Sequence, residues 1–348
     1  MGVETCLMTL LNALVDISVA PSCLKLTFFI DGIPLSKSST SQFWPILCRA
    51  EGIPNSSIFV VGCYHGESKP ESADTFLTPF VDEMCSLYQS GLCVKGRKFT
   101  IEVRAFVCDA PARAFVLGVK THSGYFSCTK CTEKGEFADQ RVAPSRTNAP
   151  PRTDDDFASK TQKEHHVGST VLERLPIGLV STFPLDYMHL VCIGVTKKFL
   201  LLWARGELPH RLSASAVAQL SESLLALKSY WCLEFARPLR SLKHLDRWKA
   251  TELRTFLLYA GPIVLKPVLP RKSYEHFIVL HVAVRILASP SLCISLNSFA
   301  KDLLFYFVNC VHRLYGRRHM SYNVHGLIHL AGDVLLHGCL DTYSAFAG

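Results

Sequence analysis

The sequence predicts a mixed α/β fold in which a strand-rich first third is followed by a mainly helical remainder. β-rich runs bounded by turn residues occupy residues 24–31, 43–50 and 57–64. An amphipathic helical pattern follows over residues 76–88, and residues 99–109 then alternate strictly between apolar and polar side chains. Beyond residue 170 nearly every apolar segment has helical spacing.

These elements follow one another as three strands, a helix and a fourth strand. The three strands are joined by short connections, so we expect them to pair as an antiparallel meander. A short helix is expected over residues 110–118. Further helices are expected at residues 186–204, 213–235, 247–260, 273–288 and 295–315.

The chain divides into four predicted segments. Residues 1–118 form the first part of the sheet-containing core, and residues 119–170 hold a Cys/His knuckle and a polar loop. Because residues 132–170 are rich in Pro, Arg, Asp and Thr, we expect them to be exposed or partly disordered. Residues 171–246 form a helical insertion, and residues 247–348 form a further helix and a C-terminal helical region.

The charge balance favours an acidic partner. The 348 residues include 37 Lys and Arg against 29 Asp and Glu, a formal net charge of +8, and nucleic-acid phosphate is a common partner of basic proteins. No run of five or more basic residues forms a tail. The fourteen cysteines are scattered through long apolar segments, which favours a reducing compartment over a disulfide scaffold.

The N-terminal stretch does not have the pattern of a secretory signal. It is apolar, but it contains Glu4 and Asp16 and has no basic leader. No apolar stretch reaches the length of a membrane span. We therefore expect a protein inside the cell with no membrane partner.

Two acidic residues end predicted strands. Asp31 ends the first strand and Asp109 ends the fourth. Carboxylates that project from the same edge of a sheet can share divalent cations, which is the arrangement that two-metal phosphoryl transfer needs. A third acid is usually required. The alternative is that each Asp is a turn or cap residue, as Asp often is at strand ends.

Cys128 and Cys131 form the sequence CTKC, whose spacing lets two thiolates occupy adjacent corners of a zinc tetrahedron. One such pair supplies half a site. The nearest candidates for the other zinc ligands are histidines, with two further cysteines as alternatives: His122, His165 and His166, or Cys108 and Cys192. A redox C-x-x-C normally opens a helix after a strand, and that setting is absent here.

Asp186 and His189 lie three residues apart at the start of a predicted helix. Side chains at this spacing share a helical face, so the Asp can hold the His. The spacing alone favours a structural interpretation, in which Asp186 caps the helix and His189 is half-buried.

Five blocks of this sequence resemble, in order, the CACTA (En/Spm)-type DNA transposases of animal genomes. The blocks are IDGIPLSKSSTSQFWPIL (30–47), VCDAPARAFVLGVKTHSGYFSCTKC (107–131), FPLDYMHLVCIGVTKKFLLLW (183–203), WKATELRTFLLYAGPIVL (248–265) and YNVHGLIHLAGDVLLHGCLDTYSAF (322–346). The resemblance spans nearly the whole chain. It implies a ribonuclease-H-like mixed sheet split by a large, mainly helical insertion.

The resemblance also implies roles for individual residues. Asp31 and Asp109 match the first two catalytic carboxylates, and Glu252 in WKATELR matches the third. Together they would bind two Mg²⁺ ions, or Mn²⁺, and catalyse strand cleavage and strand transfer on double-stranded DNA. Asp186 and His189 match an acid-x-x-His pattern that would contact DNA or order the active site. A nuclear location follows, and self-association is left open.

Basic residues near the five blocks are candidates for a DNA phosphate track, although most surface cations have no such role. They are Lys37, Arg113, Lys120, Lys130, Lys197, Lys198, Lys249 and Arg254, with Arg317, Arg318 and His319 as a further group.

Two other functions remain open. An inactive or host-adopted remnant would act only as a nuclear DNA-binding or protein-binding module. That alternative is favoured because the chain starts shortly before the first catalytic strand, with no preceding DNA-binding domain expected, and stops at SAFAG. A zinc-dependent hydrolase is a weaker alternative, since the sequence has no H-E-x-x-H signature.

Overall fold

The computed structural model describes residues 2–35, 40–54, 56–232 and 234–347 of the chain. They form two compact units. Of the described residues, the first unit contains those up to 134, those from 150 to 185 and residue 347, and the second unit contains those from 135 to 149 and from 186 to 346. None of the helices in the described ranges combines the length and the apolar character that crossing a bilayer requires.

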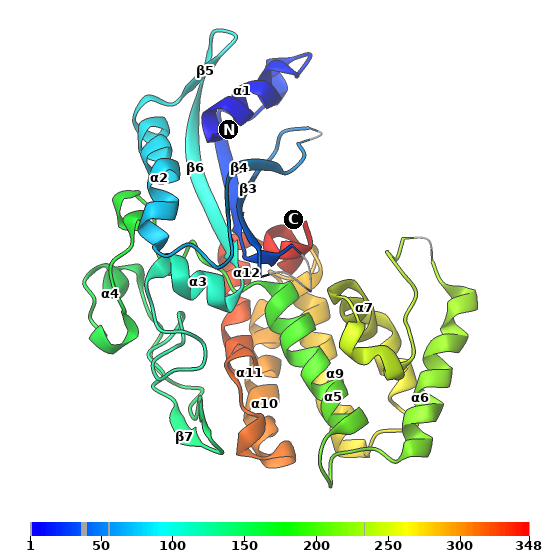
Figure 1. Ribbon diagram of the computed structural model, residues 1–348. Coiled ribbons are helices and arrows are strands. Elements are labelled where there is room, and N and C mark those ends of the chain that lie inside the picture. The colour runs from blue at the N-terminus through cyan, green and yellow to red at the C-terminus, as the bar shows by residue number, and fades with distance from the viewer. Residues whose placement is uncertain (1, 36–39, 55, 233, 348) are drawn as a thin grey trace. The chain divides into compact units, whose positions relative to one another are not determined.

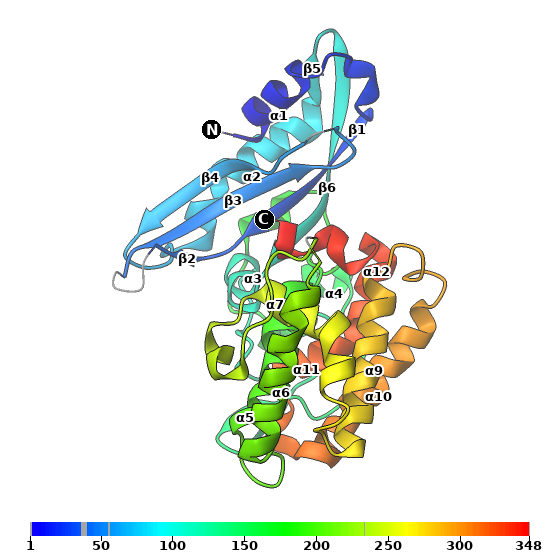
Figure 2. The same ribbon diagram turned by 90° about the vertical axis from the view of Figure 1, so that its right-hand side faces the viewer.

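The first unit is built on a mixed sheet. As predicted, the first three long strands form an antiparallel meander. The strand that follows the helix pairs in parallel with the first strand. Figures 1 and 2 show these strands side by side. The meander consists of β1 (Cys23–Ile30), β3 (Gln42–Ala50) and β4 (Phe59–Gly66), and it is followed by α2 (Ala73–Ser90) and β6 (Arg97–Cys108). Two short strands that were not predicted, β2 (Ile33–Pro34) and β5 (Leu92–Val94), extend the sheet.

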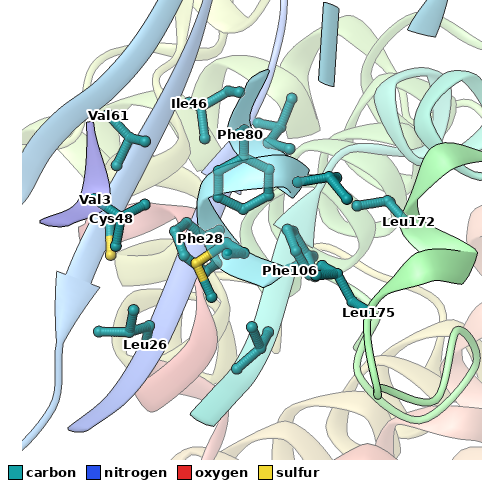
Figure 3. Close-up of a cluster of buried hydrophobic side chains, with 14 of the residues drawn as sticks. Val3, Leu26, Phe28, Ile46, Cys48, Val61, Phe80, Phe106, Leu172 and Leu175 are labelled. Atoms are coloured by element: carbon teal, nitrogen blue, oxygen red, sulfur yellow. The ribbon is translucent and has the colours of Figure 1, made fainter. Parts of the chain in front are cut away.

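One face of this sheet carries the core of the unit. The ring of Phe28 on β1 lies 4.8 Å from that of Phe80 on α2 and 5.3 Å from that of Phe106 on β6, measured between centroids. Figure 3 shows this cluster, with Leu172 and Leu175 beside it. Full burial of such side chains contributes about 1.5–3 kcal/mol each, so the contacts fix α2 on the sheet.

The apolar N-terminal stretch is a helix, α1 (Val3–Asn12), which the sequence analysis did not predict. Val3, Leu7 and Leu11 recur at every fourth position and are fully buried in the same core. This helical spacing explains the apolar composition, since the stripe covers apolar core side chains.

Residues 119–185 are more ordered than the sequence suggested. After α3 (Ala110–Leu117), the chain forms α4 (Asp154–Ala158), η2 (Lys163–His165) and η3 (Val171–Arg174). Phe157 and His165 are buried, whereas most of residues 132–170 are exposed or half-buried, so the expected exposure is confirmed in part and the segment has more regular structure than expected. Its many polar residues are used as local caps: Thr153 and Asp156, for example, form a capping box at the start of α4.

The second unit is mainly helical, and helices lie at each of the five predicted ranges, although the second ends at residue 230 instead of 235. Further helices within residues 242–247, 261–264 and 317–343 were not given ranges by the prediction. The helices of the unit are η4 (Met188–Thr196), α5 (Lys197–Arg205), α6 (Ala214–Ala226), η5 (Leu227–Tyr230), η6 (Leu242–Arg247), α7 (Ala250–Thr255), η7 (Phe256–Ala260), α8 (Gly261–Val264), α9 (Arg271–Ala288), α10 (Asn297–Tyr315), η8 (Arg317–His319), α11 (Tyr322–Gly326), η9 (Leu327–His329), α12 (Leu330–His337) and η10 (Leu340–Tyr343). Two of these, η4 and η7, are π-helical. A hairpin of β7 (Glu136–Ala138) and β8 (Arg141–Ala143) belongs to the same unit.

Candidate functional site

Asp31 and Asp109 follow neighbouring strands at the same end of the sheet. The preceding residues, Ile30 and Cys108, are partners in the parallel register of β1 and β6, and both belong to the core cluster. Neighbouring strands are about 4.8 Å apart. Asp31 and Asp109 therefore directly follow two adjacent strands at the same edge of the sheet, as predicted.

Both carboxylates are half-buried and accept backbone hydrogen bonds. Asp109 Oδ1 accepts from the amide of Ala112 at 2.7 Å and thereby caps α3. Asp31 Oδ1 accepts from the amide of Gly32 at 2.8 Å. The cap role weighed in the sequence analysis is thus present at Asp109. It engages one oxygen, so it orients the carboxylate without excluding a cation ligand at the other oxygen.

Two buried groups lie next to this acid pair. Burial raises the pKa of the Cys108 thiol to about 12, and the nearby Asp109 and Asp31 carboxylates raise it further against the effect of Arg113. The Arg113 side chain is buried and donates to the carbonyls of Cys108 at 3.0 Å and Pro184 at 2.8 Å. Arg113 therefore fixes the end of β6, and a place in an exposed phosphate track does not fit its burial.

Glu252 is engaged by protein donors. It lies on α7 in the second unit, is fully buried, and accepts from Arg240 Nε at 2.8 Å, from Arg240 Nη2 at 2.6 Å and from the amide of Lys249 at 2.8 Å. Burial opposes its ionisation, but these donors outweigh burial and hold its pKa below the ordinary value. Within the described ranges, no third acid joins Asp31 and Asp109 in a group of potential metal ligands. The role of Glu252 as the third acid stays a prediction.

Asp186 and His189 interact as a helix cap would, which is the structural interpretation given above. Asp186 is buried, and its Oδ2 accepts from the His189 amide at 2.9 Å and lies 2.6 Å from His189 Nδ1. Its Oδ1 accepts from the Ser344 hydroxyl at 3.3 Å and the Ala345 amide at 2.8 Å. Asp186 thus orients His189 and joins the start of η4 to the C-terminal part of the unit.

The CTKC turn is held by a buried arginine. Cys128 and Cys131 are both buried. Arg152 Nη2 donates to the Cys128 carbonyl at 3.3 Å and to the Cys131 carbonyl at 3.1 Å. The Arg152 amide also donates to the Lys130 carbonyl at 2.9 Å, so both the main chain and the side chain of Arg152 hold this turn.

Two histidines complete a group with these cysteines. His325 on α11 and His329 on η9 are one helical turn apart, and their Nε2 atoms are 3.4 Å from each other. The potential ligand atoms of Cys128, Cys131, His325 and His329 all lie within 4.8 Å of one another. Two thiols and two imidazoles are donors that zinc prefers, so this Cys/His cluster could hold a metal such as zinc.

The predicted histidine partners of the cysteines were wrong. His325 and His329 complete the cluster, and His122, His165 and His166 are outside it. His165 is buried, and its Nδ1 lies 2.6 Å from the Phe126 carbonyl. Burial also lowers its pKa to about 4. The spacing H-x-x-x-H in HGLIH was the signal that sequence reasoning passed over, because it is about 200 residues from CTKC.

A cation would also suit the protonation chemistry of the cysteines. The pKa of the Cys131 thiol is raised above its ordinary value by a hydrogen bond with Cys128, by burial and by the charge of Cys128. Two buried thiolates are thus disfavoured without a compensating positive charge, which a metal supplies.

Two further members of the predicted phosphate track make other contacts. Lys130 is buried and donates to the Val180 carbonyl at 3.0 Å, and Arg254 pairs with Asp341 at 2.6 Å. Lys37 lies outside the described residues.

Comparison with known proteins does not assign the chain to a family. No protein-family model matches it, and no curated protein matches it.

Proposed function

We propose that this protein is a ribonuclease-H-like transposase core that cleaves and joins double-stranded DNA in the nucleus, with Asp31 and Asp109 at its active site. The observation that carries this proposal is the parallel register of β1 and β6, which brings Asp31 and Asp109 to adjacent strand ends. The order of the strands also supports it. Three antiparallel strands, a helix and a fourth strand that pairs with the first form a mixed sheet, and a mixed sheet is what the resemblance to CACTA-type transposases implies.

In this proposal the two Asp residues hold the metal and orient the reacting groups. Mg²⁺ or Mn²⁺, when bound, activates the attacking hydroxyl and stabilises the leaving oxygen. The amides of Gly32 and Ala112 fix one oxygen of each carboxylate, which limits the rotation of both side chains. Preorganised ligands of this kind favour productive geometry.

Glu252 is the candidate for the third carboxylate, and protein donors already engage it. If Glu252 serves, it must exchange Arg240 and the Lys249 amide for a cation, because these donors occupy both of its oxygens. This engagement favours a second function, that of a remnant that binds DNA or protein without cleaving it. The two functions differ in whether the chain nicks DNA.

The deciding experiment measures nicking of a supercoiled plasmid with Mg²⁺ or Mn²⁺. We expect Asp31→Asn and Asp109→Asn each to lower the rate on the order of 10³-fold, the scale expected when a stabiliser of transition-state charge is lost. Asp82→Asn is the matched control, because Asp82 is an exposed acid of the same unit that pairs with Arg174. A wild-type chain without metal-dependent nicking, or Asp variants that nick at the wild-type rate, would contradict the nuclease and leave the remnant.

We propose further that the metal of the Cys/His cluster is a structural Zn²⁺ with four protein ligands. A closed set of four ligands leaves no position for a substrate, which is typical of structural sites. The supporting observations are the chemistry of the donors, their mutual distances and the buried Arg152 that fixes the CTKC turn.

Metal analysis tests this assignment. We expect about one zinc per chain, lost in Cys131→Ser and in His329→Ala. Cys93→Ser and His122→Ala are the controls, since both residues are exposed and outside the cluster. Co²⁺ substitution should give the absorption of a tetrahedral site with two thiolates. Zinc that survives both cluster variants, or that is lost in His122→Ala, would disprove the four-ligand assignment.

A further inference from the structure

Five basic side chains gather in the second unit around the end of α10. They are Arg141, Lys198, His210, Arg318 and His319, here called the Lys198 cluster. They come from β8, the first turn of α5, the loop that follows α5, and η8. Figure 1 shows where α5, α10 and β7 lie in this unit.

Carbonyl groups hold the cluster together. Lys198 Nζ donates to the His319 carbonyl at 2.6 Å, and Arg141 Nη2 donates to the next carbonyl, that of Met320, at 3.3 Å. The imidazole rings of His210 and His319 are 5.9 Å apart. Lys198 and Arg141 are therefore aimed at the same short piece of main chain.

Acidic neighbours balance only part of these charges. Arg318 pairs with Glu207 at 2.6 Å, and both side chains are largely exposed. Arg317 pairs with Glu136 beside the cluster. Across the described residues, neither Lys198 nor Arg141 has an ion pair with a carboxylate. Lysine has three donors and arginine five, so both retain donors after the carbonyl bonds.

The charges in the cluster repel one another. Burial and the nearby Arg141 lower the pKa of Lys198 to about 8. Burial lowers the pKa of His319 to about 4, assisted by Lys198, Arg318, His210 and Arg141. Lys198 and Arg141 are half-buried and pair with no carboxylate of the described residues, so their closeness is unfavourable by itself, and such sites are often functional.

We propose that Arg141, Lys198, Arg318 and His319 form a binding site for a phosphate group of a DNA backbone. An anion fits because it would supply the negative charge that Lys198 and Arg141 lack. A phosphate fits better than a single carboxylate because several donors from three elements converge, and phosphate oxygens accept from many directions. The choice of DNA over free phosphate rests on the proposed function, whereas the anion site itself rests on the cluster alone.

The test measures DNA binding to the full chain as a function of salt, with Ca²⁺ in place of Mg²⁺ so that cleavage does not interfere. We expect Lys198→Met to weaken binding about tenfold, as the loss of one charged hydrogen bond does. The slope of log K against log salt should fall by about 0.9 for the lost phosphate contact. Lys301→Met is the matched control, because Lys301 is an exposed lysine of the same unit that lies over the Phe305 ring and outside the cluster.

A second variant separates binding from a structural role of Lys198. Arg141→Gln removes a cation of the cluster without touching the Lys198 bond, and it should lower the affinity and the salt slope in the same way. If Lys198→Met and Arg141→Gln bind DNA as Lys301→Met does, the site is disproved. Titration with inorganic phosphate distinguishes the two sources: a cluster-dependent affinity for free phosphate without one for DNA would overturn the DNA assignment.

These outcomes are independent of the nuclease test. If Asp109→Asn abolishes nicking but Lys198→Met leaves affinity unchanged, the phosphate site fails and the proposed function stands. If the wild-type chain never nicks but Lys198→Met weakens DNA binding, the proposed nuclease fails and the phosphate site stands.

Discussion

The acids of the first unit and those of the second unit have different surroundings. Asp31 and Asp109 follow strand ends and are half-buried, and each is oriented by a backbone amide. Glu252 and Asp186 are buried, and protein donors engage both oxygens of each carboxylate. Four acids that a family pattern groups together thus differ in how much protein structure depends on them.

The difference separates acids that can be removed with little structural loss from those that cannot. A buried carboxylate that satisfies several donors leaves them unsatisfied when it is removed, which costs more than the bond itself gained. A half-buried carboxylate leaves groups that water can reach. Stability measurements can therefore sharpen or break the comparison.

The largest effect is expected for Glu252→Ala. The change leaves Arg240 and the Lys249 amide without their acceptor and should lower the free energy of unfolding by about 3–5 kcal/mol. Denaturant unfolding followed by circular dichroism measures it. Glu275→Gln is the control, because Glu275 pairs with Arg271 on the exposed surface of α9 and should leave the midpoint unchanged. A nearly neutral Glu252→Ala that abolishes nicking would break the comparison, since Glu252 would then behave as a catalytic acid.

Asp186→Asn should come next, at about 2–3 kcal/mol. An amide offers one oxygen in place of two, so the donors from His189 and from Ser344 and Ala345 cannot all be satisfied. The same unfolding experiment measures the loss. Asp302→Asn on the exposed face of α10 should be neutral. Equal unfolding midpoints for the two variants would show that Asp186, like Asp31 and Asp109, can be replaced with little loss of stability.

The dependence of stability on pH should show a smaller effect of Glu252. Its pKa is held below the ordinary 4.5 in the folded chain, so its contribution is complete above that value and is lost as the pH falls through the folded pKa. The stability difference between the wild type and Glu252→Gln should therefore shrink as the solution is acidified below pH 4.5. A difference that stays constant from pH 6 to the acid range would show that the charge of Glu252 is unimportant.

The smallest effect on stability is expected at Asp109. Asp109→Ala removes the cap of α3 and should cost about 1 kcal/mol, whereas Asp109→Asn keeps a side-chain acceptor for the Ala112 amide and should be nearly neutral. Thermal unfolding of the two variants measures this. A folded, stable Asp109→Asn that has lost nicking would separate catalysis from capping. A destabilised Asp109→Asn would show that the acid pair is as structural as Glu252.

Much of the fold was predictable from local patterns. Strict alternation in β6 and helical spacing in α2, α9 and α10 determine which face of each element is apolar, and burial follows from that. Asp31 and Asp109 could be found because a strand end is a local feature, whereas the parallel pairing of β1 and β6 was decided by the tertiary structure.

Long-range partners were decided only by the tertiary structure. The spacing of CTKC predicts half of a zinc site. The two histidines of the Cys/His cluster are about 200 residues away, and nearness in sequence favoured other histidines instead. In the same way, nothing around Glu252 in the sequence shows that its carboxylate pairs with Arg240. Spacing along the chain fixes contacts within one turn or one strand pair, whereas contacts between distant segments depend on how the whole chain packs.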